Sequence, residues 1–365
     1  MSHPSSQSDG MDQASRAHRG TPLQPANRFQ SLHRERELDL EDLDPAEEPL
    51  PRTEFLTDTT SSVLTRNTSP DLGFDFGLNP YRGCEHGCIY CYARPYHEFL
   101  GWSSGLDFET RILVKHDAPA LLRAEFSKPS WKPSVVALSG VTDCYQPVER
   151  KLRITRQCLE VFAEFRNPVG VITKNALVAR DVDVLQKLAR FKAVSVAISL
   201  TTLDPALRSI LEPRTSPPVA RLAAVQRLAQ AGIPVGVMIA PVIPGLNDHE
   251  IPSLVAAAAQ AGASFASTTI LRLPHSVAAL FEDWLTRHFP DRKEKVLNQL
   301  RSLRGGELND ARFGTRMRGE GPLAEQVSRL LHIACRRAGI QTRHPELSES
   351  AFRRTAAGQG ELFDP

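Results

Sequence analysis

The chain has 365 residues, 41% of them hydrophobic and 24% charged, and its formal net charge is +2. This length allows two domains or one large barrel, and the composition is ordinary for a soluble globular protein. No apolar stretch is long enough to span a bilayer, and the polar start of the chain lacks the apolar core of a signal peptide. Neither a membrane span nor a general attraction to nucleic acid is therefore expected.

Charge is nevertheless uneven along the chain. An acidic run from Glu35 to Glu48 lies in a first segment, residues 1–70, that is rich in Ser, Pro, Arg and Glu and has no sustained periodicity. We expect this polar N-terminal extension to be mostly disordered or draped over the rest of the protein. Basic residues are concentrated in the C-terminal third, from Arg287 to Arg354. That region suits phosphate binding or a solvated helix face, and both interpretations stay open.

Three cysteines follow in one short loop, with the spacing C-x3-C-x2-C and an aromatic residue directly before the third. They are Cys84, Cys88 and Cys91. Cysteine thiolates are the usual ligands of iron–sulfur clusters, and three of them leave one iron of a cubane cluster without a protein ligand. An open metal position favours catalysis over a structural role. Zinc is the competing interpretation, but it prefers four ligands in two spaced pairs, and the sequence has no second C-x2-C pair.

From about residue 72, short apolar runs alternate with amphipathic stretches. The predicted strands are 135–138, 169–172, 194–198, 235–239 and 268–271. The predicted helices between and after them are 117–126, 149–165, 176–190, 217–231 and 248–261. Strands of this kind, β-branched and apolar throughout, indicate an α/β fold with a parallel sheet covered by helices. With the strand that leads into the cysteine loop, the pattern has six units, and helices near 277–300 and 322–338 follow.

Two segments together indicate a family. The cysteine loop begins Asn79-Pro80-Tyr81-Arg82-Gly83-Cys84, and the second predicted strand ends in Val141-Thr142-Asp143-Cys144-Tyr145-Gln146-Pro147. With these motifs, residues 70–340 resemble the radical S-adenosylmethionine (SAM) superfamily, and within it the spore photoproduct lyase-like branch. The resemblance implies a partial (β/α)6 TIM-like barrel. It also implies two cofactors, a 4Fe–4S cluster on the three cysteines and S-adenosylmethionine.

The chemistry that the resemblance implies is reductive cleavage of S-adenosylmethionine to a 5′-deoxyadenosyl radical, which then abstracts hydrogen from a substrate. A nucleic acid is the favoured substrate, and a peptide or small molecule is the alternative. An electron donor such as flavodoxin or ferredoxin is an expected partner. The alternative function, from a different class, is a non-catalytic iron–sulfur redox sensor or a DNA-associated binding protein.

Active residues of such barrels collect at the C-terminal ends of the strands. Tyr90, in the cysteine loop, is expected to pack beside the adenine of the cofactor or simply to pack the loop. By the same resemblance, the end of the second strand binds the amino group of the cofactor. Its candidates are Ser139, Gly140, Thr142 and Asp143. A carboxylate suits an ammonium group, and capping of the next turn is the alternative role of Asp143.

Cys144 is the candidate donor of a hydrogen atom to the product radical, because spore photoproduct lyase uses a cysteine in this way and a thiol has a weak S–H bond. Tyr145 is the second candidate. The alternative for Cys144 is an inert buried side chain, which is common for free cysteine. Cys158 and Cys335 fall in helical patterns and are expected in the core.

The later strand ends supply the remaining candidates. Lys174 is expected to pair with the carboxylate of the cofactor, or to be a surface lysine. Ser199, Glu212 and Arg214 offer donors and acceptors for the ribose hydroxyls and the carboxylate, unless Arg214 simply bridges to Glu212. Gly245, after the fifth strand, lets the backbone approach the adenine ring closely.

The C-terminal tail carries one more signal, the run Gln359-Gly360-Glu361-Leu362-Phe363. It resembles the Gln-x-x-Leu-Phe peptide by which bacterial proteins dock on the DNA sliding clamp, so the clamp is a candidate partner. The unpaired, scattered cysteines indicate a reducing cytoplasm. The predicted division of the chain is an extension (1–70), a barrel (71–275), a helical C-terminal region (276–345) and a flexible tail (346–365).

Overall fold

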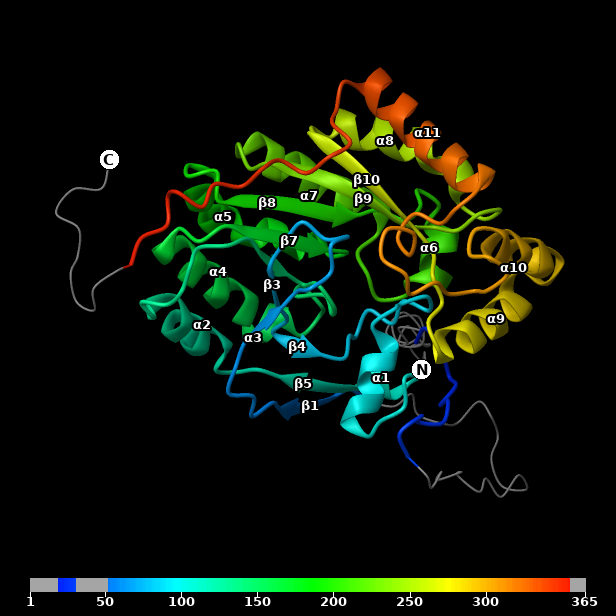
Figure 1. Ribbon diagram of the computed structural model, residues 1–365, viewed down its shortest axis with the longest axis horizontal. Coiled ribbons are helices and arrows are strands. Elements are labelled where there is room, and N and C mark those ends of the chain that lie inside the picture. The colour runs from blue at the N-terminus through cyan, green and yellow to red at the C-terminus, as the bar shows by residue number, and fades with distance from the viewer. Residues whose placement is uncertain (1–18, 31–51, 355–365) are drawn as a thin grey trace, which may run out of the picture.

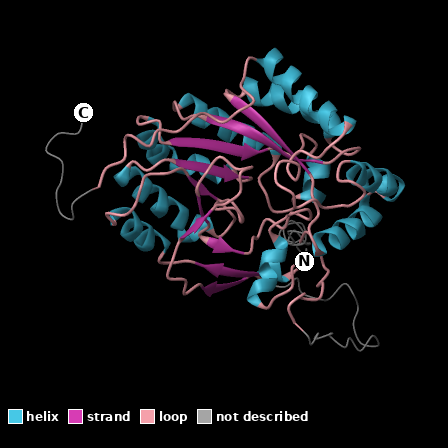
Figure 2. Ribbon diagram, in the orientation of Figure 1, coloured by secondary structure: helices cyan, strands magenta, loops and turns pink. Residues whose placement is uncertain are grey.

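Six parallel strands form the main wall of the protein, in the order in which they occur in the chain (Figures 1 and 2). The computed structural model describes residues 19–30 and 52–354. The six strands are β3 (Phe76–Leu78), β6 (Val136–Leu138), β7 (Val169–Thr173), β8 (Val194–Ser199), β9 (Val235–Val242) and β10 (Phe265–Ile270). Each pairs in parallel with the next. Strand β2 (Leu64–Arg66) closes the β3 edge in antiparallel orientation.

This sheet confirms the predicted α/β fold with six strand–helix units, because neighbouring parallel strands need crossover connections. The connecting helices are α2 (Ala118–Ser127), α3 (Glu149–Leu152), α4 (Ile154–Phe165), η3 (Ala176–Asp181), α5 (Val182–Ala189), α6 (Pro205–Leu211), α7 (Pro218–Gln230), η4 (Asp248–Glu250) and α8 (Ile251–Gln260). The predicted helix 149–165 is interrupted, because Arg153 adopts a left-handed backbone conformation with φ of 54°.

A second, smaller sheet lies beside the barrel and was not predicted. It consists of β1 (Glu54–Thr57), β5 (Arg111–Val114) and β4 (Tyr81–Arg82), with β5 in the middle. Strand β4 runs directly into the cysteine loop, and the short helices η2 (Arg94–Leu100) and α1 (Asp107–Thr110) follow that loop. The described parts of the N-terminal extension thus contribute β1 and β2, while the four-part division of the chain stays a prediction.

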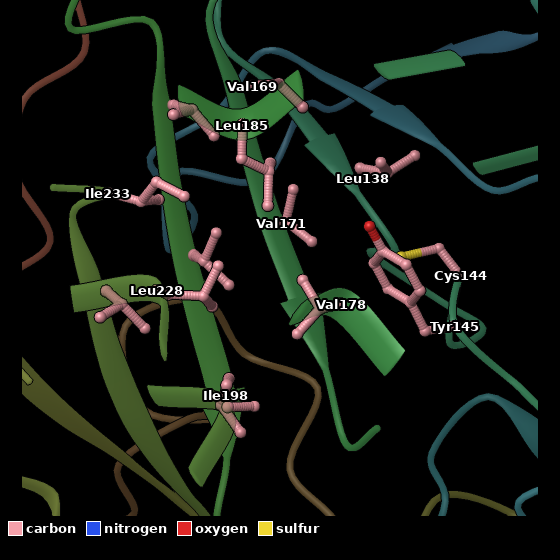
Figure 3. Close-up of a cluster of buried hydrophobic side chains, with 14 of the residues drawn as sticks. Leu138, Cys144, Tyr145, Val169, Val171, Val178, Leu185, Ile198, Leu228 and Ile233 are labelled. Carbon is pink, nitrogen blue, oxygen red and sulfur yellow. The ribbon is translucent and has the colours of Figure 1, made fainter. Parts of the chain in front are cut away.

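The main hydrophobic core lies between the sheet and its covering helices. Figure 3 shows part of it, in which Val169 and Val171 of β7, Ile198 of β8 and Leu228 of α7 are fully or nearly fully buried. A second buried cluster joins the cysteine loop, through Ile89, to helices α9 (Ser276–His288) and α10 (Lys293–Ser302). The short helix η5 (Pro290–Arg292) lies between these two, and α11 (Pro322–Ala338), whose buried side chains belong to the main core, follows them.

The C-terminal helices sit in two places. Helices α9 and α10 lie beside the carboxyl ends of the strands, whereas α11 packs along α8 (Figure 1). In the described part of the chain, no helix combines the length and the apolar character that crossing a membrane demands. The proposed clamp peptide, residues 359–363, lies outside the described residues.

Candidate cluster and cofactor site

The three cysteines of the loop are brought into one neighbourhood. Cys84 and Cys88 are buried and Cys91 is half-buried, and all three are free, as are the three cysteines elsewhere in the chain. The loop is pinned by its backbone, since the Cys84 amide donates to Phe108 at 2.9 Å. The Cys91 amide donates to Cys88 at 3.2 Å, which folds the two thiol-bearing residues back on each other.

A buried guanidinium holds this loop in shape. Arg94 is 0% exposed and lies three residues after the last cysteine of the loop. It donates to four carbonyl oxygens, those of Gly87, Cys88, Ser104 and Gly105, at 3.0–3.3 Å. Its charge is balanced by Glu109, which accepts at 2.6 Å and is also 0% exposed. A buried charge with this many partners fixes the backbone, because moving the loop away would leave the guanidinium and Glu109 without compensating contacts.

The N-terminal segment 19–30 packs on the same loop. The amide of Gly20 donates to Glu109 at 2.9 Å, and an added Cβ at Gly20 would lie 1.7 Å from the carbonyl oxygen of Gly87. Only glycine permits this close approach of the two backbones. Farther along, Asn27 donates to the carbonyl of Glu98 at 2.8 Å. The described part of the extension therefore supports the wall that carries the cysteines.

Tyr90 is oriented by a buried carboxylate. Its hydroxyl donates to Glu212, which also accepts from Thr201 at 2.6 Å and from the guanidinium of Arg221. Glu212 is 0% and Arg221 1% exposed. Burial opposes the charged form, but the charges of Arg221 and Lys174, aided by hydroxyl donors, lower the pKa of Glu212 to about 2. Glu212, predicted as a ribose ligand, thus has its oxygens engaged by protein groups and positions Tyr90.

Lys174 reaches over Tyr90 from the end of β7. Its ammonium donates to the Ser199 hydroxyl at 2.8 Å and lies 5.8 Å from the centre of the Tyr90 ring. Ser199, at the end of β8, donates in turn to the carbonyl of Ala240 at 3.1 Å. Lys174, Ser199 and Tyr90, three sequence-predicted residues, are therefore brought together beside the cysteine loop. Lys174 is the cation among these three residues, and it is therefore the one best suited to bind a carboxylate.

Asp143 joins the end of β6 to the end of β7. It accepts from the hydroxyl of Thr173 and the amide of Lys174, each at 2.7 Å, and it lies 3.4 Å from His86 Nδ1 in the cysteine loop. Burial opposes its charged form, but His86 and the hydrogen bonds lower the pKa of Asp143 to about 2. It also accepts from the amide of Tyr145 at 2.8 Å. The predicted turn cap is therefore present, while binding of the cofactor's amino group by Asp143 stays a prediction.

The rest of this strand end is held by local hydrogen bonds. Ser139 has a left-handed φ of 83°, and its hydroxyl donates to the carbonyl of Thr142 at 2.7 Å. The Thr142 hydroxyl donates to the carbonyl of Tyr81 at 2.6 Å, so it is used within the fold. Gly140 is half-buried, and its carbonyl accepts from the hydroxyl of Tyr92 at 2.5 Å. This last bond ties the strand end to the residue after Cys91.

The two candidate hydrogen donors lie in the main core. Cys144 and Tyr145 are both 0% exposed, and Figure 3 shows them together among the apolar side chains near Leu138 and Val178. Burial, and then the charges of Asp143 and Glu149, raise the pKa of the Cys144 thiol. The Tyr145 hydroxyl donates to Asp181 at 3.0 Å. This setting matches the buried alternative left open for Cys144, and the donor role of either residue stays a prediction.

Arg214 and Gly245 lie apart from the Tyr90 network. The Arg214 guanidinium is 3.3 Å from Glu85, so the alternative bridge to Glu212 is wrong: Glu212 is taken by Arg221 instead. Next to Arg214 is a cavity of about 170 Å³ lined by Pro147, Arg150, Asn175, Arg214, Thr215, Ser216 and Pro217. Gly245 has φ of 77° in the turn after β9, and its amide donates to Asp248 at 3.0 Å.

Four residues that the sequence analysis did not select complete the site: Arg94, Glu109, Arg221 and His86. No spacing rule indicates that Arg94 folds back on its own loop or that Arg221 pairs with Glu212. For His86 the sequence does offer an indication of a role in the site, since this residue lies between Cys84 and Cys88.

The donor set of the loop fits an iron–sulfur cluster better than zinc, because it offers three thiols from one turn, all uncommitted to disulfides. His86 faces Asp143 and Asn175 and is engaged there rather than held free as a fourth ligand. Within residues 19–30 and 52–354, no three His, Cys, Asp or Glu side chains are already arranged around one metal position. The fit therefore rests on the chemistry of the donors.

Comparison with known proteins agrees with this chemistry. Residues 78–258, from the end of β3 to α8, match the family model of the radical SAM superfamily. The chain belongs to the radical SAM superfamily. The matched region contains the three cysteines and every strand end discussed above except that of β10.

Proteins similar to this chain occur in bacteria and archaea. An uncharacterised protein of Mycobacterium tuberculosis is 38% identical over 222 residues, which cover 60% of this chain and 65% of that protein. An uncharacterised protein of Methanocaldococcus jannaschii is 29% identical over 181 residues, covering 49% of this chain and 64% of that protein. The chain thus matches these curated relatives over slightly less than two thirds of their length.

The solved structures to which this radical SAM protein is similar include spore photoproduct lyase. The lyase complexed with dinucleoside spore photoproduct superposes with a TM-score of 0.60 at 15% identity, covering 79% of this chain and 81% of that chain. A variant with bound AdoMet and dinucleoside spore photoproduct gives a TM-score of 0.58 at 15% identity, covering 79% and 80%. The partial barrel expected from the sequence is therefore shared with that enzyme's fold.

Proposed function

We propose that this radical SAM protein is an enzyme that reductively cleaves S-adenosylmethionine at a 4Fe–4S cluster held by Cys84, Cys88 and Cys91. When bound, these two groups supply a 5′-deoxyadenosyl radical for hydrogen abstraction. The observation that carries the proposal is the meeting of the cysteine loop, through Tyr90, with Lys174 and Ser199 at the ends of β7 and β8.

The chain's own residues have separable tasks in this proposal. Lys174 is the cation for the carboxylate of the cofactor, with Ser199 beside it as a hydroxyl donor. Tyr90 presents its ring next to Lys174, and Glu212 holds that ring in place. Ser139 and Gly140 offer backbone groups at the end of β6, while Gly245 and Arg214 are candidates at the edge of the site.

We further propose a nucleic-acid substrate. The support is the shared fold with spore photoproduct lyase, whose solved complexes hold a dinucleoside, together with the basic C-terminal third of this chain. The proposed partners are an electron donor such as flavodoxin or ferredoxin and, through Gln359–Phe363, the DNA sliding clamp. A reducing cytoplasm is the proposed location, which suits six free cysteines.

The test is an anaerobic assay for 5′-deoxyadenosine. The protein is reconstituted with iron and sulfide, then mixed with dithionite and S-adenosylmethionine, and iron content is measured alongside product. We expect product from the wild type and from Cys335→Ala, a matched buried cysteine outside the loop. The Cys84/Cys88/Cys91→Ala triple variant should bind no cluster and form no product.

Two results would contradict the proposal. A wild type that binds no iron–sulfur cluster would remove its basis. A stable cluster that yields no 5′-deoxyadenosine, even with oligonucleotides present, would favour the alternative of a redox sensor or DNA-associated binding protein.

A further inference from the structure

Exposed aromatic side chains are concentrated on one face beside the cysteine loop. In the described part of the chain, the exposed large aromatic residues are Phe29, Phe55, Tyr92, Tyr96, Phe99 and Phe313. Four of these six, Phe29, Tyr92, Tyr96 and Phe99, form what we call the aromatic row. Three of the four come from the cysteine loop and η2, directly after Cys91, and the fourth comes from the N-terminal segment.

Three rings of the aromatic row, those of Phe29, Tyr96 and Phe99, lie close to one another while remaining open to solvent. Phe29 stacks on Phe99 with ring centres 4.7 Å apart, and Tyr96 lies 6.4 Å from Phe99. Phe99 is 68% exposed and Tyr96 is 56% exposed, so neither ring is buried by the described fold. The row therefore exposes ring faces and edges that an apolar core would have covered.

One end of the aromatic row reaches the mouth of the barrel. Tyr92 bonds to the carbonyl of Gly140 at the end of β6, and Arg272, just after β10, lies 4.9 Å from the centre of the Tyr92 ring. These two strands are separated by three others in the sheet, so Tyr92 and Arg272 span the opening of the partial barrel. A ligand bound along the row would thus extend to Tyr92, the residue next to Cys91.

Arg272 has a ring neighbour but no anionic partner in the described part of the chain. Among residues 19–30 and 52–354 its guanidinium has no hydrogen-bonded or ion-paired partner, and its one ring contact is with Tyr92. Burial lowers the pKa of Arg272, and the neighbouring charge of Arg316 lowers it further. Arg316 differs, since it is paired with Asp71 at 2.7 Å. Arg272 is half-buried and is accordingly available to an anionic ligand on this face.

Aromatic faces in a row with a neighbouring unpaired arginine match the requirements of single-stranded nucleic acid. Unstacked bases pack on aromatic rings whatever their sequence, and arginine binds the phosphates between them. A duplex offers no free base faces, and an apolar protein partner would leave Arg272 unpaired. The chemistry of this face therefore favours splayed bases over either alternative.

We propose that the aromatic row binds unstacked bases of single-stranded nucleic acid, with Arg272 binding a backbone phosphate at the barrel mouth. This inference deepens the proposed function and rests on its nucleic-acid substrate. It assigns Tyr96 and Phe99 to substrate delivery and gives them no part in holding the cluster or S-adenosylmethionine.

The test is fluorescence anisotropy with labelled single strands of about 12 nucleotides, a length within the usual range of one binding site. DNA and RNA strands are measured in separate arms, with the duplex as a third. We expect Tyr96→Ala and Phe99→Ala to weaken single-strand binding about tenfold each. Phe55→Ala, which removes an exposed aromatic ring from β1 outside the row, is the matched control and should leave affinity unchanged.

Arg272→Gln tests the phosphate contact separately. Loss of one phosphate contact should reduce the slope of log affinity against log salt by about 0.7 for a single strand. Formation of 5′-deoxyadenosine without nucleic acid should be unchanged in Tyr96→Ala, because the ring lies outside the cofactor site. A preference for DNA or for RNA in the two arms would identify the natural strand.

Several outcomes would overturn the inference. Equal affinities of wild type, Tyr96→Ala and Phe99→Ala would do so, as would a preference for duplex. A wild-type dimer that becomes monomeric in Phe99→Ala would assign the row to a contact between two copies of the chain. If the variants bind single strands as well as the wild type does but 5′-deoxyadenosine forms normally, only the inference about the aromatic row is wrong. If single strands bind through the row but no 5′-deoxyadenosine forms, only the proposed reaction is wrong.

Discussion

The stretch from Cys88 to Leu100 has two faces that differ in how their polar and aromatic groups are used. On the inner face, Arg94 is 0% exposed and each of its contacts is with the protein itself. On the outer face, Tyr96 and Phe99 are mostly exposed, and the ring of Phe99 lies against those of Tyr96 and Phe29. The comparison indicates that the inner face fixes the cysteine loop, whereas the outer face is free to bind something else.

Arg94→Met should have the largest effect on the inner face. The substitution keeps most of the side-chain length, but it leaves Glu109 as a buried charge without its ion-pair partner and removes one donor from each of four carbonyls. We expect a loss of about 3–5 kcal/mol in the free energy of unfolding, measured by denaturant titration. Iron incorporation during reconstitution should fall with it, because the loop loses its internal support.

The control for Arg94 is Arg287→Ala, which removes an exposed arginine paired with Asp283 on α9. Exposed pairs contribute about 0–1 kcal/mol, so this variant should be nearly as stable as the wild type. If Arg94→Met matched Arg287→Ala in stability, the inner face would not be the rigid element described above.

Gly20→Ala should have the next largest effect, because its new methyl group would lie 1.7 Å from the carbonyl oxygen of Gly87. Relief requires the N-terminal segment to move away from the loop, at a cost of about 1–3 kcal/mol in the free energy of unfolding. The same variant should show faster tryptic cleavage after Arg28. Gly73→Ala is the control, since nothing lies within 4 Å of its added carbon. Equal behaviour of the two variants would show that segment 19–30 does not brace the loop.

Tyr90→Phe should have a smaller effect, since it removes one hydroxyl and keeps the ring beside Lys174. Its donor bond to the charged Glu212 is buried, so we expect a loss of about 1.5 kcal/mol in thermal or denaturant unfolding. Tyr92→Phe, on the other side of Cys91, removes a hydroxyl bonded to a carbonyl on a part-exposed ring and should lose less. A larger loss for Tyr92→Phe would reverse the assignment of inner and outer tyrosines.

The parallel strands could be predicted from the sequence because each is a short, nearly continuous apolar run. The predicted start of β10 is three residues late, since Ser267 separates Phe265 and Ala266 from the rest of the strand. The small sheet was missed because β1 is exposed at every position and carries no burial pattern. The break at Arg153 also has no sequence signal, because neither Gly nor Pro marks it.

The candidate site could be predicted to the extent that strand ends carry polar residues. Lys174 and Ser199 were found in this way, and they do meet. The role of Glu212 could not be predicted in this way, since the packing of α7, and not a motif, brings its partner Arg221 to it. Arg214 likewise bridges to Glu85, 129 positions away in the chain, and sequence spacing gives no access to such a contact.

Phe99→Ala should have the smallest effect on stability, and for that reason it is the sharpest test of the comparison. Its ring is 68% exposed and contacts Phe29 and Tyr96, so truncation should change the free energy of unfolding by no more than about 0.5 kcal/mol. Phe108, nearby but 2% exposed, is the matched core residue, and Phe108→Ala should lose about 3–5 kcal/mol. An aromatic side chain that stability does not require, yet whose loss weakens nucleic-acid binding, is retained for that binding. A Phe99→Ala variant as unstable as Phe108→Ala would instead place the ring in the structural core, and the outer face would have no spare surface to offer a ligand.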